Sequence, residues 1–496
     1  MNPGTWLGLD FGTSSAKGVL LDSGGTVVAR HAVAYPSKYG QHGEAEQDPA
    51  AYLAAARDLI AACGGRESIR GVGLSGQTPT LVLTDAGGDP VRPAMTWQDH
   101  RASAEAAELE RLLGPAEPLV GTSLPWTAAY FPAKLLWLSR HERSSVARTR
   151  WLLQPKDFVG LHLTGSPCSD PWSSKGLCHV GTGQPADAVL ENTGWSRDAV
   201  PPLAPAWHAR GTVTPAAADA FGLRAGTPVA VGWSDALAAM LAAGAFTEPT
   251  GFVLTGTSSI VGLSVDHAPA EVTGLMTIPE TCAPLAVCYG PTESSGASVL
   301  WLARLLGRDL GEVLELAASA RGEVPAFVPY LAGERAPVWR TDVRGSFGGL
   351  SVDDGPEALA LGVVMGVCLS EADVLDLAEE QTGRRASHVR IAGRGAAGPP
   401  WRNARLAALG RPVRVLEEPD ASAVGAAMLG AASAAGNDLG AARVLGGGAE
   451  LLEPGPDADR DAAARLARYR AHARKTIAVS DRIAAPADET EQAHVL

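Results

Sequence analysis

The chain has 496 residues, more than one hydrophobic core usually holds, which predicts two domains. Its 54 acidic residues outnumber 41 lysines and arginines, and the formal charge of -13 argues against a nucleic-acid-binding or anionic-membrane surface. Six cysteines form no Cys-x-x-Cys pair, and we find neither a signal segment nor an apolar run of roughly 18 residues. We therefore expect a cytoplasmic protein with reduced cysteines and no membrane partner.

The N-terminal half begins with apolar or alternating segments separated by an Asp-Ser-Gly-Gly turn, which predicts an antiparallel meander. Residues 48–65 have helical spacing, with Asp48-Pro49 at the start and two glycines at the end. A buried strand is expected at 69–76, a helix at 131–141, and a strand leading into a small-residue helix at 227–245.

A domain boundary is expected near residues 246–251. We therefore predict an N-terminal domain at 1–245, a C-terminal domain at 246–479 and a mobile tail at 480–496, where the sequence is polar and rich in alanine.

The sequence Gly-Thr-Ser-Ser occurs twice, at residues 12–15 and 256–259, each time after a β-prone segment. Consecutive N–H groups and hydroxyls in such a turn form a nest for phosphate oxygens. Asp10, just before the first loop, is a candidate carboxylate for a magnesium ion bound to a nucleotide. The alternative is a pair of plain hairpin turns with a buried aspartate capping one of them. The repetition suggests that the two halves arose by duplication.

Other nucleotide-binding motifs are only partly represented in the chain. No Gly-x4-Gly-Lys-Ser/Thr motif occurs, which excludes the P-loop class. Gly-x-Gly-x-x-Gly occurs first at 71–76, inside the expected strand, where a dinucleotide site is not expected. It occurs again at 393–398, between a strand and a helix, with Glu417 or Glu418 where a ribose-binding acid is expected. An NAD-binding oxidoreductase therefore stays open as an alternative.

Together these segments resemble the FGGY family of carbohydrate kinases, which have an actin-like, ribonuclease H-like ATPase fold. The resemblance extends from Leu7 to about Ala435. It rests on seven segments that occur in the family's order. They are the first phosphate loop (8–22), the sugar segment (73–102), the Lys-x-x-Trp segment (133–141), the catalytic-aspartate segment (226–245), the second phosphate loop (253–259), the Gly-Glu-Arg segment (328–339) and the adenosine loop (391–413).

The resemblance implies an α/β fold of two domains, with ATP and Mg2+ bound in a cleft between them and the sugar bound mainly to the N-terminal domain. It implies that Asp235 is the general base for the attacking sugar hydroxyl, whereas the alternative is that Asp235 caps the helix that follows. Lys134 and Trp137 are expected to pack their helix. The candidate residues are Gln77, Trp97, Asp99, Arg101 and Trp126 for the sugar, Gly12, Thr13, Ser14, Ser15, Lys17, Gly256, Thr257, Ser258, Gly393, Arg394, Gly395 and Ala396 for ATP, and Asp10 for the metal.

The sequence departs from the nearest pattern, that of xylulokinases, at sugar-contacting positions. Thr78-Pro79 replace Met-His, and Ala236 replaces the Asn that follows the catalytic aspartate. Losing such polar contacts puts the identity of the sugar in doubt more than the reaction. D-xylulose is the leading substrate expectation. The alternatives are another ketose or a polyol (ribulose, erythritol, glycerol), or a non-catalytic sugar-binding regulator. A homodimer is a further expectation.

Overall fold

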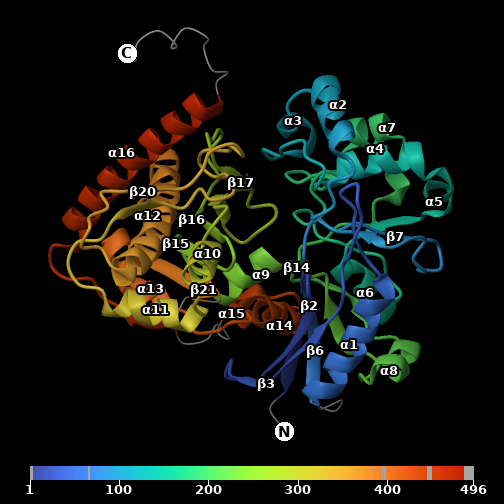
Figure 1. The fold of residues 1–496 in the computed structure, drawn as a ribbon. Coiled ribbons are helices and arrows are strands. Elements are labelled where there is room, and N and C mark those ends of the chain that lie inside the picture. The colour runs from blue at the N-terminus through green and yellow to red at the C-terminus, as the bar shows by residue number, and fades with distance from the viewer. Residues whose placement is uncertain (1–3, 65–67, 394, 396–397, 444–448, 485–496) are drawn as a thin grey trace.

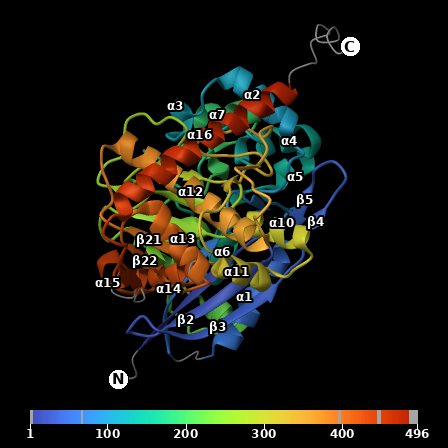
Figure 2. The same ribbon diagram turned by 60° about the vertical axis from the view of Figure 1, so that its left-hand side comes forward.

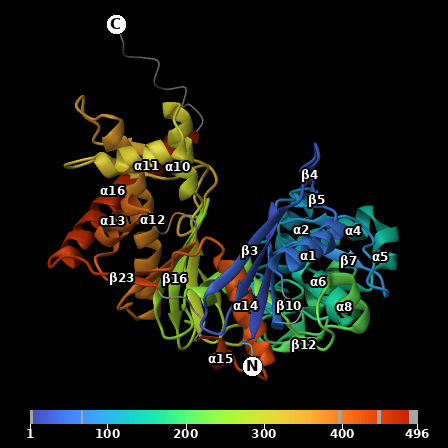
Figure 3. The ribbon, with the colours of Figure 1, turned by 90° about the horizontal axis from the view of Figure 1, so that it is seen from below.

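Two lobes, each built around a mixed β-sheet, lie side by side (Figure 1). The computed structural model describes residues 4–64, 68–393, 395, 398–443 and 449–484. Figure 3 shows β3 and α14 between the two groups of helices.

The N-terminal lobe has a seven-stranded sheet in the order β12-β13-β6-β1-β2-β3, with β14 also paired to β6. Strands β1, β2 and β3 form the predicted antiparallel meander, and β6 runs parallel to β1. The strands are β1 (Thr5–Phe11), β2 (Ser15–Leu21), β3 (Val27–Ala34), β6 (Ile69–Gly76), β12 (Ala209–Thr212), β13 (Pro228–Ala230) and β14 (Trp233–Ser234).

The C-terminal sheet repeats this arrangement in the order β17-β18-β16-β15-β21-β22-β23. Strand β15 is antiparallel to β16, β16 is antiparallel to β18, and β21 is parallel to both β15 and β22, as β6 is to β1 and β13. This shared topology supports the duplication inferred from the repeated loop. The strands are β15 (Gly251–Thr255), β16 (Ser259–Val265), β17 (Met276–Ile278), β18 (Ala286–Pro291), β21 (Val389–Gly393), β22 (Val413–Val415) and β23 (Glu450–Leu452).

Helix α1 (Pro49–Cys63) shows how local signals set the element ends. The Asp48 side chain accepts a hydrogen bond from the Ala50 N–H, and Gly64 follows the helix with a φ of 65°. The other helices of this lobe are α2 (Ser103–Leu113), α3 (Glu117–Val120), α4 (Phe131–His141), α5 (Arg143–Arg148), α6 (Pro155–Thr164), α7 (Asp187–Thr193), α8 (Pro215–Phe221) and α9 (Asp235–Ala242), with a short 3-10 helix at Arg197–Ala199. Short strands are β4 (Lys38–Tyr39), β5 (Ala45–Gln47), β7 (Val82–Thr84), β8 (Ala94–Met95), β9 (Trp151–Leu153), β10 (Cys178–His179) and β11 (Gln184–Pro185).

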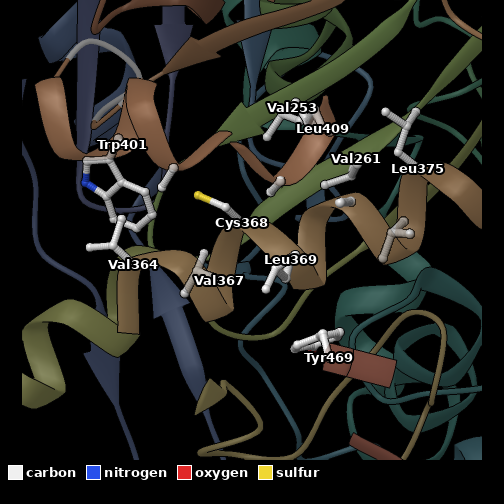
Figure 4. Packing of buried hydrophobic residues seen from close by; sticks show 14 of the residues in the cluster. Val253, Val261, Val364, Val367, Cys368, Leu369, Leu375, Trp401, Leu409 and Tyr469 are labelled. Carbon is white, nitrogen blue, oxygen red and sulfur yellow. The ribbon is translucent and has the colours of Figure 1, made fainter. Parts of the chain in front are cut away.

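The core of the C-terminal lobe is built around the long helix α12 (Pro356–Thr382), whose Val364, Val367 and Cys368 pack among other apolar side chains (Figure 4). Of the helices in the described part of the chain, α12 alone is long and apolar enough to cross a membrane, but 72% of its most apolar window is buried inside the protein. It therefore serves as a core helix.

Other elements cover α12 and complete the C-terminal lobe. Helix α16 (Ala458–Ala484) lies across the outside of the lobe and contacts α12 and α13 (Figure 2). It includes residues 480–484 of the predicted mobile tail, and the rest of that tail lies outside the described residues. The remaining elements are α10 (Gly296–Leu306), α11 (Leu310–Ser319), α13 (Pro399–Leu409), α14 (Ala421–Ala434), α15 (Leu439–Arg443), β19 (Ala326–Val328) and β20 (Ser346–Gly348).

Helix α14 joins the lobes by packing on β1 and β6 of the N-terminal sheet. This approach needs glycine, because a Cβ at Gly8 or Gly73 would overlap the backbone carbonyl oxygen of Ala423 or Ala426. Gly73 belongs to the first Gly-x-Gly-x-x-Gly sequence, which lies within β6 and serves helix packing. Trp233 and Phe252, from opposite lobes, share one apolar cluster beside this contact.

Candidate active site

Three neighbouring strands of the N-terminal sheet end side by side and bring the two predicted aspartates to one edge. Asp10 on β1 is the register partner of Ser75 on β6, and Ser75 is the partner of Trp233 on β14, two residues before Asp235. The Ser75 hydroxyl donates to Asp10 Oδ1 at 2.9 Å. Burial raises the pKa of Asp10, and the charge of Lys17 partly offsets this rise. The edge is therefore a small acidic site under the first loop.

Asp235 is the first residue of α9, but it does not cap that helix. Ser234 is the capping residue, and its hydroxyl accepts from the Leu237 N–H at 3.5 Å. The carboxylate of Asp235 accepts from the Ala236 N–H at 2.7 Å. Desolvation and the charge of Asp10 raise the pKa of Asp235 to about 7. The capping alternative is thus wrong, and the carboxylate has a pKa suited to a base near neutral pH.

The first Gly-Thr-Ser-Ser loop is held by its carbonyl groups. The Tyr35 hydroxyl donates to the Gly12 carbonyl, and Gln47 Nε2 donates to the Thr13 carbonyl at 2.6 Å. In the described part of the chain, the N–H groups of Thr13 and Ser14 have no hydrogen-bond partner. The loop therefore offers open donors of the kind that bind phosphate.

The second loop is held in the same way by the start of α10. The Gly296 N–H donates to the Gly256 carbonyl at 3.0 Å, and the Ala297 N–H donates to the Thr257 carbonyl at 3.0 Å. Among the described residues, the N–H groups of Thr257 and Ser258 likewise find no partner. Both loops thus direct their carbonyls into the fold and leave donors free.

The expected adenosine loop begins next to the second phosphate loop, because Gly393 at the end of β21 is the register partner of Thr255. Gly393 and Gly395 have φ of 102° and 82°, a conformation that favours glycine. Arg394 and Ala396 lie outside the described residues.

Lys17 lies opposite Asp10 across the β1–β2 hairpin and is already paired with another carboxylate. Its Nζ is 3.3 Å from Asp420 Oδ1, just before α14. Lys17, which the sequence predicts to contact the nucleotide, therefore forms an ion pair between the two lobes.

The predicted sugar residues fall into two groups. Gln77 and Trp97 lie beside the first loop. Gln77 is buried and donates to Gln47 Oε1 at 2.7 Å, while its own Oε1 has no partner among the described residues. Trp97 is 42% exposed and donates to Thr13 Oγ1 at 2.9 Å. Both side chains can therefore still meet a ligand.

Asp99 and Arg101, by contrast, are engaged with each other. Arg101 Nη2 lies 2.7 Å from Asp99 Oδ2 and 2.7 Å from Glu46 Oε1, and Asp99 also accepts from the Ala45 N–H at 2.9 Å. Lys134 is buried and donates to the Thr96 carbonyl at 2.7 Å. Asp99, Arg101 and Lys134 therefore hold the loop that carries Trp97, and Lys134 does so as a hydrogen-bond donor to the backbone of that loop.

Trp126 is placed elsewhere, in a groove of about 610 Å³ between the lobes that Trp339 lines from the C-terminal side. Its indole N–H donates to the Gly114 carbonyl at 2.6 Å. The described lining of this groove includes neither Asp235 nor Gln77, so the structure does not bring Trp126 together with the other candidates.

Comparison with known proteins identifies the chain. Residues 5–242 match the N-terminal domain and residues 251–434 the C-terminal domain of the FGGY family of carbohydrate kinases. The chain belongs to this family. It is an ATP-dependent carbohydrate kinase with the family's actin-like fold, as predicted.

Similar proteins include several xylulose kinases. The xylulose kinase of Escherichia coli strain K12 is 30% identical over 416 residues, covering 80% of this chain and 83% of that protein. The gluconokinase of Bacillus subtilis strain 168 is 25% identical over 443 residues and covers 86% of each chain. The crystal structure of xylulose kinase from Rhodospirillum rubrum superposes with a TM-score of 0.85 at 26% identity, covering 96% of this chain and 100% of that one.

Membership of the FGGY family replaces the oxidoreductase alternative. The two acids proposed to bind the ribose of NAD also have other partners. Glu418 lies 2.8 Å from Arg30, and Glu417 pairs with Arg402. Sequence reasoning missed Lys175, which is buried and whose charge interacts with that of Asp235. Its loop, Trp-Ser-Ser-Lys-Gly, has neither periodicity nor a motif that could have pointed to it.

Proposed function

We propose that this FGGY kinase transfers the γ-phosphate of ATP to a sugar hydroxyl, with Asp235 as the general base. The observation that carries the proposal is the juxtaposition of Asp235 with Asp10 at one sheet edge, beside a loop with open N–H donors. Asp235 accepts the proton as the hydroxyl oxygen attacks phosphorus. Positioning and charge stabilisation supply most of the remaining catalysis in this type of reaction.

The residues present fit ATP and Mg2+. The open N–H groups of the two loops suit phosphate oxygens, and Asp10 offers a carboxylate to a metal ion through water. Within the described residues there is no cluster of three or more His, Cys, Asp or Glu side chains that could hold a metal alone. We propose that Asp10 would hold a Mg2+ ion of the nucleotide, which would neutralise phosphate charge when bound.

For the acceptor, the relatives favour D-xylulose, because xylulose kinase is the commonest name among them. Gluconate is a second candidate acceptor, because a gluconokinase matches over 86% of this chain. Pro79 and Ala236 replace the His and the Asn that make polar contacts in the xylulokinase pattern, which suits a shifted preference. A cytoplasmic location and a homodimer stay predictions.

A coupled assay of ADP release with ATP and Mg2+ tests the proposal. The panel contains D-xylulose, D-ribulose, L-ribulose, erythritol, glycerol and D-gluconate. We expect saturable turnover with at least one acceptor, and calorimetry should show binding of Mg-ADP but not of NAD. Tight NAD binding without ADP binding, or no turnover with any acceptor, would contradict the proposed reaction.

A further inference from the structure

Three lysines are buried in the described part of the N-terminal lobe, and they differ in how their charge is satisfied. Lys156 Nζ lies 2.6 Å from Asp157 Oδ1 and 2.9 Å from Asp170 Oδ1. Lys134 donates to three backbone carbonyls, with the shortest contact at 2.7 Å. Lys156 thus has the close anionic partners that a buried charge requires. Lys134 has carbonyl acceptors but no anion, and burial lowers its pKa to about 7.

Lys175 lacks such partners. Its side chain is nearly fully buried, yet its one hydrogen bond is a 3.4 Å contact to the Trp172 carbonyl. No carboxylate of the described residues lies within 4.0 Å of its Nζ. The nitrogen lies 4.8 Å from the ring centre of Trp172 and 5.8 Å from that of Tyr130. Two aromatic faces stabilise the cation in part but leave its N–H donors open.

The surroundings place Lys175 near Asp235, the proposed base. Its charge interacts with those of Asp235 and Asp170, and burial lowers the pKa of Lys175 to about 8. The backbone carbonyl of Ser173, two residues before Lys175, lies 3.4 Å from the Thr78 hydroxyl, whose closer acceptor is Gln154 Oε1. Thr78 belongs to the sugar loop that also carries Gln77. Ser173 Oγ and Gln77 Oε1 are both buried without a partner in the described part of the chain. Gln77 follows Gly76, the register partner of Ser234, so its open oxygen lies at the end of the strand next to the one that leads to Asp235.

We propose that Lys175 binds a carboxylate of the acceptor, which favours an open-chain sugar acid, the class of the second candidate acceptor, over D-xylulose, the first. The inference rests on the proposed kinase reaction and deepens it. A substrate carboxylate would give Lys175 the close anionic partner that Lys156 has, and hydroxyls of the same substrate would occupy Gln77 and Ser173. Paired, hydrogen-bonded charges in a buried site are strong and specific.

The chemistry of transfer is unchanged by this assignment. A bond forms between the acceptor hydroxyl oxygen and the γ-phosphorus, and the bond from that phosphorus to the oxygen bridging to the β-phosphate breaks, giving ADP. The hydroxyl proton passes to Asp235. The carboxylate on Lys175 orients the acceptor and takes no part in bond making.

The test compares each acid with its neutral amide, which differs in charge but hardly in shape. Initial rates are measured with D-gluconate, D-gluconamide, D-xylonate, D-xylonamide and D-xylulose. In the wild type we expect kcat/KM for an acid to exceed that for its amide by about a hundredfold, as for a buried charge-assisted pair. Lys175→Met should abolish this ratio, whereas Lys175→Arg should keep part of it. Lys475→Met, at an exposed site on α16, is the matched control and should leave it unchanged.

The outcomes separate this inference from the proposed function. If D-xylulose is turned over and no acid is, or if Lys175→Met lowers acid and amide rates equally, the assignment of Lys175 is wrong and the kinase proposal stands. If no acceptor is phosphorylated and Mg-ADP does not bind, the proposed function itself fails. Melting temperature and ADP affinity report whether each variant folds, and the comparison of acid with amide in the wild type decides the question even if Lys175→Met does not fold.

Discussion

The two lobes contain the same five-strand unit, but their equivalent hairpins carry different chemistry. In the N-terminal lobe Asp10 lies opposite Lys17 across the hairpin, whereas in the C-terminal lobe Leu254 lies opposite Ile260. Leu254 and Ile260 pack in or against the apolar cluster between the lobes. At this position the duplicated scaffold therefore carries an acid–lysine pair in one hairpin and an apolar pair in the other.

The hairpins also differ in length although the four-letter sequence is the same. In the first, residues 12–15 lie between the last register pair, Phe11 and Ala16. In the second, only residues 256–258 lie between Thr255 and Ser259. The same four residues thus occur in both loops, but the register of the flanking strands leaves four residues between the strands in the first hairpin and three in the second.

The largest loss of activity is expected from substitution of Asp235, the proposed base, which belongs to the N-terminal lobe. Asp235→Asn keeps the size of the side chain but removes the base, so kcat should fall about a hundred- to ten-thousandfold. Stability and ADP affinity should hardly change, because Ser234 caps α9 and is untouched. Steady-state kinetics, thermal melting and ADP calorimetry measure these three effects.

A matched control is Asp187→Asn, because Asp187 is also the first residue of a helix but is half exposed on α7. Its kcat should stay within about twofold of the wild type, as for a surface substitution. Near-normal turnover in a folded Asp235→Asn protein would remove Asp235 from the mechanism.

The second effect concerns Asp10, the acid that Leu254 replaces in the other lobe. Asp10→Asn keeps an acceptor for the Ser75 hydroxyl but removes the charge offered to the metal. Loss of a preorganised charge at such a site should lower kcat/KM about a hundredfold, and more Mg2+ should be needed for half-maximal rate. A titration of rate against Mg2+ at fixed ATP measures both changes. An unchanged Mg2+ dependence would argue that Asp10 serves structure alone.

The third expected effect is a dependence of kcat/KM on pH, set by Asp235 in the N-terminal lobe. Asp235 acts as a base only when deprotonated, and its pKa is raised to about 7 by burial and by Asp10, while Lys175 and Lys17 act in the opposite direction. Log kcat/KM should therefore fall by about one for each pH unit below 7 and level off above it. A profile that stays flat down to pH 5 would mean that Asp235 titrates lower or is not the base.

Local signals in the sequence predicted much of the fold. Asp48 and Gly64 marked both ends of α1, and alternation predicted the opening meander, because capping and pleat depend on nearby residues. The packing of α14 on the opposite lobe was not predictable, since Gly73 and Ala426 are far apart in sequence and no periodicity connects them. Non-local contacts of this kind need the folded chain.

Some residues of the candidate site could likewise be predicted from the sequence, and others could not. Asp10 and Asp235 were found because each lies next to a recognisable loop or helix, and the structure places them at one sheet edge. The pairing of Asp99 with Arg101 was missed, because a motif does not show which polar groups satisfy one another. Lys175 was missed because its burial and lack of a close anion arise only in three dimensions.

The smallest effect is expected on the nucleotide side, where the second loop rests on the start of α10. In Gly296→Ala the new Cβ would lie 2.7 Å from the Gly256 carbonyl oxygen, so the loop must move away from the helix. Displaced phosphate donors should raise the KM for ATP about tenfold, equivalent to about 1.4 kcal/mol of binding, while kcat/KM for the acceptor at saturating ATP changes little. Gly455→Ala is the control, because a Cβ there meets no atom within 4 Å. If Gly296→Ala instead lowers kcat and leaves the KM for ATP unchanged, the second loop does more than hold the nucleotide, and the division of labour between the two hairpins would have to be redrawn.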